Sequence, residues 1–261
     1  MQKTLIEKIP IAIPKEVVPY VEGAKLYDSS CQSGAKVYYV EKGEGYFLKI
    51  APKGTLIKEC EMTRYFHKKG KGAEVVHFSS NESDVMLSKR VLGEDCVHSM
   101  YLSEPKRLSI LLGEELRKLH ELDCTDCPRT NKMEEYVARA KENYLTDNYD
   151  KSHFPDNFGY RSGVEAYSVL MEGKDALKSE VLLHGDYCLP NVMLKDWNLS
   201  GFIDVGEGGI GDRHVDLFWG LWSLGFNLKT ERYNDLFLDA YGKDKVDKEI
   251  LKIISAIEVF G

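Results

Sequence analysis

The chain has 261 residues, of which 43% are hydrophobic and 30% are charged, a composition typical of globular proteins. This length allows one large or two modest domains, and no apolar run reaches the roughly 18 residues needed to span a bilayer. The formal charge of −7 argues against a general nucleic-acid-binding protein, whose binding surface is basic. The first residues carry prolines and charges instead of the apolar core of a signal peptide, so we expect a cytoplasmic protein.

The charge is divided unevenly along the chain. Residues 1–90 hold 15 Lys and Arg against 11 Asp and Glu, a net charge of +4, whereas residues 91–261 hold 20 against 31, a net charge of −11. An anionic ligand in the first part and a cationic ligand in the second would suit this division, although a chance surface composition would also produce it.

The first ninety residues predict a sheet with one helix. Runs rich in β-branched and aromatic residues indicate strands at 35–43, 45–50, 75–80 and 84–88, in two pairs that each turn through a short polar loop. Between the pairs, residues 55–69 carry apolar side chains at helical spacing and stop before a glycine. The order β-β-α-β-β predicts an antiparallel sheet with one helix.

The rest of the chain predicts mostly helices. Residues 106–122 form the clearest amphipathic pattern, with five leucines on one side. Further helices are expected at 134–145, 164–173, 212–226, 232–242 and 248–260, with two short strands before the last three. We therefore expect an α+β protein with two domains, 1–90 and 91–261.

Two motifs carry the chemistry, LLHGDYCLPNVML at 182–194 and SGFIDVGEGG at 200–209. Asp186 can accept a proton from a hydroxyl group, while Asn191 and Asp204 supply the hard oxygen atoms that Mg²⁺ prefers. Phosphoryl transfer requires this division of labour, and the spacing D-x-x-x-x-N followed by a second Asp matches a kinase catalytic loop. A polar turn between two strands is the structural alternative.

Lys49 lies within the apolar strand run YFLKI. It is expected to have a carboxylate partner, because burying an unpaired ammonium costs free energy. Glu59 on the predicted helix can supply it, with Glu61 as the second choice. A kinase uses such a lysine–glutamate pair to hold the phosphates of its nucleotide. A lysine that reaches solvent from an edge strand is the alternative.

Other reactive residues are interpreted as structural. We expect His184 to brace the loop by hydrogen bonds and Cys188 to pack rather than act as a nucleophile. The C-x-x-C of Cys124 and Cys127 lacks two further ligands at zinc-site spacing, so we expect two free thiols. Four aromatic residues fit a buried helix face: Phe218, Trp219, Trp222 and Phe226.

HGDYCLPNVML, SGFIDVG, YFLKI and RKLHELD together resemble the aminoglycoside phosphotransferase family, in particular its 3′-phosphotransferases, or kanamycin kinases. The resemblance runs from about Ser33 to Phe260. It implies a bilobal protein-kinase-like fold with a small antiparallel-sheet lobe and a larger helical lobe. It also implies ATP and Mg²⁺ as cofactors and an aminoglycoside as substrate, with the 3′-hydroxyl as the expected acceptor and antibiotic resistance as the result.

By matching position, the resemblance makes Asp186 the catalytic residue, Asn191 and Asp204 the magnesium ligands, and Lys49 with Glu59 the phosphate-binding pair. Four further residues would bind the nucleotide: Ser33, Phe47, and the backbone of Ser88 and Arg90. Three would bind the aminoglycoside: Asp156, Glu258 and Phe260. Aminoglycosides are polycations, so the net charge of −11 in the second part suits them.

Two positions depart from the family pattern, since Glu207 and Trp222 stand where the family has arginines. These two positions leave open which aminoglycosides are substrates. The sequence also leaves open the choice between ATP and GTP and the oligomeric state. A kinase of another small alcohol, such as choline, homoserine or a sugar, is an alternative, and a catalytically silent nucleotide-binding module is another. A protein kinase lacks support because H-R-D, D-F-G and A-P-E are absent, and a metal-dependent hydrolase because no second histidine at ligand spacing accompanies His184.

Overall fold

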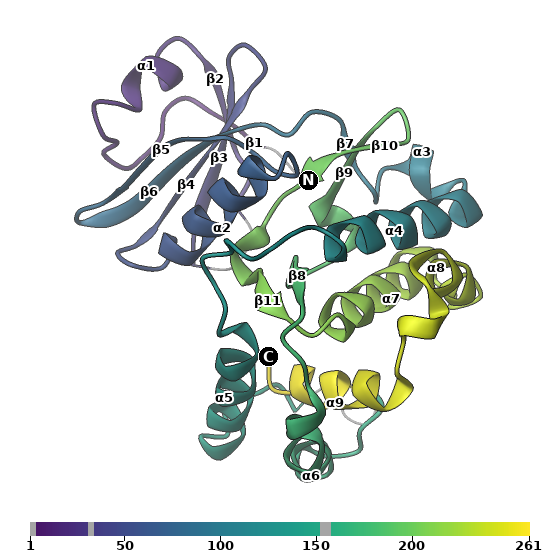
Figure 1. Ribbon diagram of the computed structural model, residues 1–261. Coiled ribbons are helices and arrows are strands. Elements are labelled where there is room, and N and C mark those ends of the chain that lie inside the picture. The colour runs from purple at the N-terminus through teal and green to yellow at the C-terminus, as the bar shows by residue number, and fades with distance from the viewer. Residues whose placement is uncertain (1–3, 31–33, 152–157) are drawn as a thin grey trace. The chain divides into compact units, whose positions relative to one another are not determined.

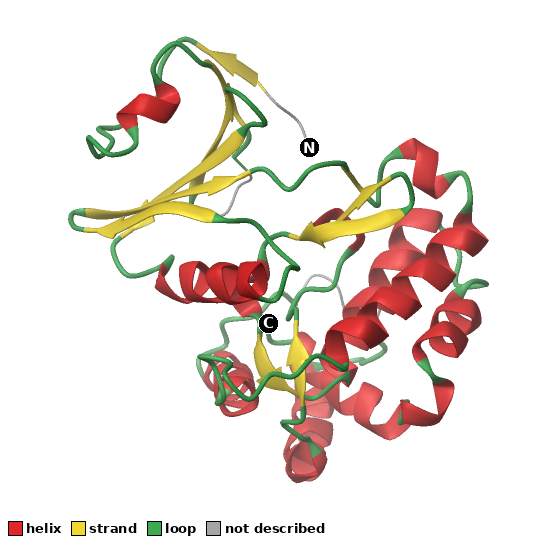
Figure 2. Ribbon diagram, turned by 45° about the horizontal axis from the view of Figure 1, so that its top comes forward, coloured by secondary structure: helices red, strands yellow, loops and turns green. Residues whose placement is uncertain are grey.

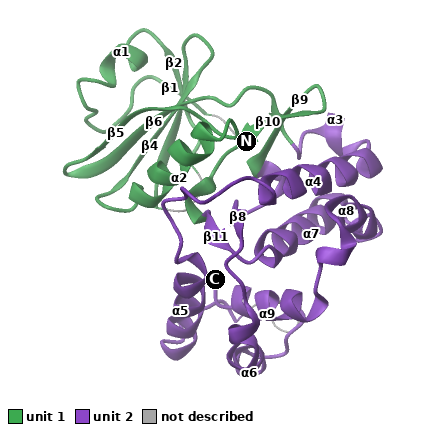
Figure 3. Ribbon diagram, viewed as in Figure 1, with its two compact units in different colours: residues 1–95, 191–207 green, residues 96–190, 208–261 purple. Residues whose placement is uncertain are grey.

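A computed structural model describes residues 4–30, 34–151 and 158–261. The chain forms two compact units, which Figure 3 shows in different colours. The first comprises residues 1–95 and 191–207, and the second comprises residues 96–190 and 208–261. The division after residue 95 lies close to the expected position at residue 90. The return of residues 191–207 to the first unit was not expected from the sequence.

The first unit is built on a six-stranded antiparallel sheet (Figure 1). Its strands in spatial order are β1 (Thr4–Ile6), β2 (Lys25–Asp28), β3 (Lys36–Glu41), β4 (Tyr46–Pro52), β6 (Ser83–Lys89) and β5 (Val75–Ser80). The four strands predicted from the sequence are thus present as β3 to β6. The edge strand β1 and its neighbour β2 were missed, because they are only three and four residues long. A four-residue helix, α1 (Val18–Val21), lies between them in the chain.

Alternation along the strands separates the two faces of this sheet. Leu48 and Ile50 of β4 lie in an apolar cluster on one face, together with Val85 and Leu87 of β6. The residues between them, Lys49 of β4 among them, point to the opposite face. Helix α2 (Ile57–Lys68) covers that face, as its buried Cys60 packs with Met86 of β6.

The start of α2 is fixed by a buried carboxylate. Asp84 of β6 is fully buried and accepts hydrogen bonds from the backbone N–H groups of Gly54, at 2.9 Å, and Leu56, at 2.7 Å. Burial favours the neutral acid, but hydrogen bonds from Ser80, Gly54 and Leu56 lower the pKa of Asp84 below its ordinary value. Because the loop before α2 is held in this way, the position of α2 over the sheet is set by a residue of the sheet itself.

A smaller sheet completes the first unit. Strand β7 (Glu94–Asp95) pairs with β9 (Val192–Lys195), which forms an antiparallel hairpin with β10 (Asn198–Phe202). A short 3-10 helix (Val205–Glu207) follows β10. Asp204 lies between β10 and this helix. It belongs to the first unit because it directly follows the hairpin of β9 and β10.

The second unit is mostly helical (Figure 2). Its helices are α3 (Ser99–Leu102), α4 (Pro105–His120), α5 (Lys132–Leu145), α6 (Gly163–Gly173), α7 (His214–Leu228), α8 (Asn234–Tyr241) and α9 (Lys248–Glu258), with short 3-10 helices at Lys174–Ala176 and Lys243–Lys245. A further 3-10 helix, Leu189–Asn191, begins in this unit, and its last residue belongs to the first unit. The six helices predicted from apolar periodicity are confirmed with ends that agree to within about two residues. Only the four-residue α3 was not expected.

Helices α4 and α8 lie close together because α4 carries a glycine at their contact. A Cβ atom on Gly113 would lie 2.3 Å from the backbone oxygen of Phe237, so no larger residue fits there. Beside these helices, the two-stranded antiparallel sheet of β8 (Val181–Leu183) and β11 (Gly209–Gly211) frames the loop that begins at His184. None of the described helices is long and apolar enough to cross a membrane.

Candidate active site

Lys49 forms an ion pair with each of two carboxylates in the first unit. Its Nζ lies 2.6 Å from Oε1 of Glu59 and also contacts Oδ1 of Asp204, which is 155 residues away in the sequence. The side chains of Lys49 and Glu59 are mostly buried, whereas that of Asp204 is 44% exposed. Glu61, the second choice from the sequence, lies exposed on α2. The structure therefore assigns the counter-charge of Lys49 to Glu59 and adds Asp204.

These carboxylates keep the ammonium charged. Burial disfavours the charged form of Lys49, but the charges of Asp204 and Glu59 and their hydrogen bonds outweigh it and raise the pKa of the lysine above its ordinary value. Lys49 is thus a permanent positive charge in the wall of a cavity. A phosphate group is the kind of ligand that such a fixed ammonium binds.

A cavity of about 340 Å³ in the first unit lies beside this cluster. Lys49 pairs in register with Val37 of β3 and Met86 of β6, and Phe47 pairs with Ser88, so these side chains share the face of the sheet that lines the cavity. Its other walls come from α2 and from the segment after β10: Glu59, Thr63, Phe202, Ile203, Asp204 and Val205. The cavity is lined mostly by apolar groups together with a few charged side chains, which suits a ligand with an apolar part and a phosphate.

The backbone of Ser88 and of Arg90 was expected to contact the nucleotide base, and the two residues differ in their position relative to the cavity. Ser88 lines the cavity, and so do Lys89 and Val91, whereas Arg90 does not. The N–H of Arg90 donates a hydrogen bond to the oxygen of Gly45 at 3.0 Å and is therefore engaged in the protein. Ser33 lies outside the described residues.

Asn191 and Asp204, the expected magnesium ligands, both belong to the first unit. The backbone N–H of Ile203 donates to the oxygen of Asn191 at 3.0 Å, so the residue before Asp204 is tied to Asn191. Within the described part of the chain, no group of three or more His, Cys, Asp or Glu residues could hold a metal. One amide and one carboxylate fit Mg²⁺, which is bound by few protein oxygens, phosphates and waters.

Asp186 lies in the second unit, in a loop held by another carboxylate. Asp216 of α7 is fully buried and accepts hydrogen bonds from the N–H groups of His184, at 2.7 Å, and Gly185, at 2.8 Å. The N–H of Asp186 in turn donates to Nδ1 of His184 at 3.2 Å, so the expectation that His184 braces the loop is confirmed. Sequence reasoning missed Asp216, because an aspartate inside an apolar helix pattern carries no sign of its partners 31 and 32 residues earlier.

Cys188 is unsuited to nucleophilic chemistry. Burial raises the pKa of its thiol far above the ordinary value, and the negative charge of Asp186 adds to this effect. A hydrogen bond with Ser223 of α7 acts in the opposite direction without compensating for it. The interpretation of Cys188 as a packing residue stays a prediction, and Cys124 and Cys127 are free thiols, as expected.

Glu258, an expected substrate contact at the end of α9, lies in a cluster of aromatic residues. Its carboxylate accepts hydrogen bonds from the hydroxyl of Tyr136 and from Nε1 of Trp219, the latter at 2.8 Å. Burial raises the pKa of Glu258 to about 7 despite these hydrogen bonds. The side chain of Phe260 is fully buried and makes edge contacts with Tyr144 and Tyr149. Asp156 lies outside the described residues.

The expectation of a buried aromatic face on α7 is wrong for two of its four members. Trp222 is 40% exposed and Phe226 is 56% exposed, and their rings stack on each other at 5.1 Å. The buried side of α7 instead carries small and aliphatic residues such as Ser223 and Leu224. Residues 222 and 226 are one turn apart, so both fall on the side of α7 away from this core.

The family model that matches this chain is that of the phosphotransferase enzyme family, over residues 30–252. The chain belongs to this family. This phosphotransferase is 44% identical over 257 residues to a probable aminoglycoside 3′-phosphotransferase of Lactococcus lactis subsp. lactis (strain IL1403), covering 98% of this chain and 96% of the relative. It is 31% identical over 234 residues to an aminoglycoside 3′-phosphotransferase of Niallia circulans, covering 87% and 89%.

Solved structures agree with this assignment. The phosphotransferase matches an aminoglycoside 3′-phosphotransferase of type VIII with a TM-score of 0.79 and 25% identity, covering 92% of this chain and 94% of that one. It shares its fold with an aminoglycoside phosphotransferase of Streptomyces rimosus in complex with ADP and streptomycin, with a TM-score of 0.71, 20% identity, and coverage of 86% and 90%. The resemblance to the aminoglycoside phosphotransferases and the kinase-like α+β fold are confirmed, and the chain is a phosphotransferase.

Proposed function

We propose that this phosphotransferase transfers the γ-phosphoryl group of ATP to the 3′-hydroxyl of an aminoglycoside in the cytoplasm, with Mg²⁺ as cofactor, and so confers antibiotic resistance. The observation that carries the proposal is the ammonium of Lys49, held between Glu59 and Asp204 in the wall of a cavity. Its relatives of 44% and 31% identity bear the name of aminoglycoside 3′-phosphotransferases, which supports the choice of substrate.

In this proposal the first unit binds the nucleotide. Phe47 and Ser88 contact the base in the cavity that they line, and Lys49 binds the phosphates while Glu59 keeps it in place. The base would meet the backbone beside Ser88 through groups other than the N–H of Arg90, which already donates to Gly45. Ser33 stays a predicted contact of the phosphates.

Asn191 and Asp204 would hold Mg²⁺, which supplies charge neutralisation for the phosphate oxygens when it is bound. The ammonium of Lys49 contacts Asp204, so this carboxylate has a positive partner within the protein itself.

The second unit would supply the acceptor chemistry. The hydroxyl oxygen of the substrate forms a bond to the γ-phosphorus, and the bond from this phosphorus to the bridging oxygen of ADP breaks, with its electron pair leaving on ADP. Asp186 orients the hydroxyl and accepts its proton. The loop around Asp186 is suited to this role because Asp216 fixes the two residues before it.

A cationic substrate suits the charge of the second unit. Its residues, 96–190 and 208–261, hold 19 Lys and Arg against 26 Asp and Glu, a net charge of −7, which attracts polycations, and we propose Glu258 and Asp156 as carboxylates that bind amino groups. The buried ring of Phe260 would hold the end of α9, and with it Glu258, without contacting the substrate through its side chain.

A substrate comparison tests the proposal. ATP consumption and phosphorylated product should be measured with kanamycin, neomycin and tobramycin, which lacks the 3′-hydroxyl. We expect turnover with the first two and none with tobramycin. Equal turnover of all three would refute the 3′ position, and turnover of choline, homoserine or a sugar without turnover of any aminoglycoside would refute the substrate class.

A further inference from the structure

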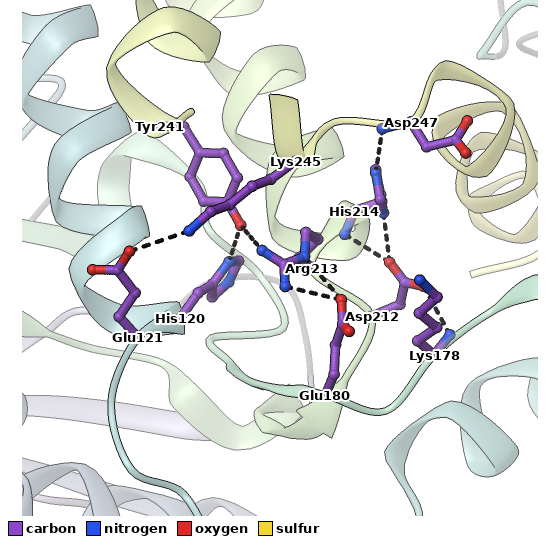
Figure 4. A network of polar contacts seen from close by, with 10 residues as sticks. All are labelled: His120, Glu121, Lys178, Glu180, Asp212, Arg213, His214, Tyr241, Lys245 and Asp247. Atoms are coloured by element: carbon purple, nitrogen blue, oxygen red, sulfur yellow. Dashed lines mark hydrogen bonds and ion pairs between the residues drawn. The ribbon is translucent and has the colours of Figure 1, made fainter. Parts of the chain in front are cut away.

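His120, at the end of α4, uses both ring nitrogens in buried hydrogen bonds. Its Nε2 lies 3.1 Å from Oδ2 of Asp216, and its Nδ1 lies 2.8 Å from the hydroxyl of Tyr241, at the end of α8. Figure 4 shows His120 facing Tyr241, and Tyr241 facing Arg213. All three residues meet within the second unit, although His120 and Tyr241 are 121 residues apart in the sequence.

With His120 in its neutral form, the chemistry of these groups fixes the direction of each hydrogen bond. A carboxylate has only acceptors, so Nε2 of His120 must donate to Asp216. A neutral imidazole with Nε2–H has an acceptor at Nδ1, and the hydroxyl of Tyr241 must then donate to it. The oxygen of Tyr241 is left as an acceptor for Nη1 of Arg213, which lies 3.3 Å away and can only donate. Every donor in the series therefore has an acceptor.

The series of hydrogen bonds that runs from Asp216 through His120 and Tyr241 to Arg213 ends in an ion pair. Nε of Arg213 lies 3.0 Å from Oε1 of Glu180, and its Nη2 lies 2.9 Å from the same oxygen. Burial disfavours the charge of Arg213, but Tyr241 and Glu180 raise the pKa of the guanidinium above its ordinary value. Burial also raises the pKa of Tyr241 to about 12, so its hydroxyl keeps the proton that it donates to His120.

The near end of the series is the loop of Asp186. Oδ2 of Asp216 accepts hydrogen bonds from Nε2 of His120 and from the N–H of His184. The other oxygen of Asp216 accepts one from the N–H of Gly185. Gly185 has a φ of +86°, a left-handed conformation that these contacts maintain. If His120 turned or changed its tautomer, Asp216 would lose one of the donors that hold it in this orientation.

We propose that Tyr241 is a positioning residue for phosphoryl transfer, which fixes the tautomer of His120 and, through Asp216, the loop that carries Asp186. This inference rests on the proposed function, since it assigns Asp186 to catalysis. Tyr241 acts through His120 and touches no reacting group. The aligned hydroxyl, and not merely the buried ring, is the part of Tyr241 that this role requires.

The test compares Tyr241→Phe with Tyr160→Phe. Tyr160 is a matched control because it is also buried in the second unit and donates a hydrogen bond to the backbone oxygen of Lys252 at 2.7 Å. We expect Tyr241→Phe to lower kcat about ten- to a hundredfold with both KM values unchanged, and Tyr160→Phe to leave kcat unchanged. Similar kcat values for Tyr241→Phe and the wild-type protein would overturn the inference.

A second variant separates positioning from loss of stability. In His120→Gln, the side-chain amide can donate to Asp216 whatever its neighbour does, so adding Tyr241→Phe to this variant should lower kcat no further. A full additional loss in the double variant would show that Tyr241 acts by another route and would overturn the inference.

Two measurements do not depend on turnover. The ¹⁵N shifts of His120 should show the Nε2–H tautomer in the wild-type protein and a mixture in Tyr241→Phe, and the amides of His184 and Gly185 should exchange faster in that variant. Unchanged shifts and exchange would overturn the inference. A wild-type protein that phosphorylates no aminoglycoside would refute the proposed function, and these two measurements would still decide the role of Tyr241.

Discussion

Nζ of Lys49 lies 2.6 Å from Oε1 of Glu59, ten residues later in the chain, and this pair joins the central strand β4 to helix α2. The same ammonium contacts Asp204, which the chain reaches only after passing through the second unit. One lysine therefore contacts two carboxylates from separate segments, and all three side chains line the same cavity.

Glu59→Gln tests the partner of Lys49. Losing the charged partner leaves Lys49 free to turn towards Asp204, so we expect the KM for ATP to rise about tenfold, the equivalent of one charged hydrogen bond. Glu61→Gln is the matched control, because Glu61 lies exposed on the same helix two residues later. Steady-state kinetics with ATP and calorimetric binding of ATP would measure both variants. Equal effects of the two substitutions would contradict the assignment of Glu59.

Asp186→Asn tests the proton acceptor. The amide keeps the size of the carboxylate but cannot take a proton, so we expect kcat to fall by about 10²- to 10⁴-fold with ATP affinity unchanged. Cys188→Ser is the control in the same loop, and we expect it to keep most of the activity because burial disfavours the thiolate form of Cys188. An inactive Cys188→Ser that folds normally would speak against this account of the loop.

Removal of divalent cations tests the metal site. We expect chelation with EDTA to stop phosphoryl transfer and Mg²⁺ to restore it, because the phosphates lose the charge that neutralises them. The thermal unfolding temperature of the nucleotide-free protein should stay the same, since Lys49 already provides the positive partner of Asp204. A large drop of this temperature on chelation would instead indicate a structural metal.

Glu258 predicts a change of stability with pH. Burial raises its pKa from the ordinary 4.5 to about 7, so between these values the folded protein holds a proton that the unfolded chain has released. The free energy of unfolding should therefore fall as the pH rises from 4.5 to 7, by roughly 2 kcal/mol from this residue. Glu258→Gln cannot ionise, so its stability relative to the wild-type protein should increase across this range in urea denaturation. A difference that stays constant with pH would show that folding does not raise the pKa of Glu258.

The two sides of α7 predict opposite responses to alanine. Phe226→Ala removes a ring that is 56% exposed, and we expect it to lower the free energy of unfolding by about 1 kcal/mol or less. Leu224→Ala opens a cavity at a fully buried position and should cost about 2–5 kcal/mol. Urea denaturation of both variants measures the contrast. Similar losses would mean that the stacked Trp222 and Phe226 are buried in solution.

Helix α4 shows how far a local pattern reaches. Its leucines recur at helical spacing, so one amphipathic side specified the element and its ends. The spacing of Asp186, Asn191 and Asp204 likewise predicted kinase chemistry, because the catalytic groups of this family lie close together in the chain. The choice between Glu59 and Glu61 needed the structure, since both lie on one helix and only its packing against the sheet decides which faces Lys49.

By itself, the sequence determined the helices, the central strands, the family and the catalytic motifs, since each depends on residues within a few turns or one loop of each other. Only the tertiary structure decided the contacts that join distant segments. Asp204 contacts Lys49 although the two are 155 residues apart in the sequence, and His120 contacts Tyr241 at a separation of 121 residues. No local sequence pattern predicts either pair. The exposure of Trp222 and Phe226 was decided in the same way, because an aromatic residue on a helix is buried or exposed according to what packs against it, and periodicity alone cannot tell.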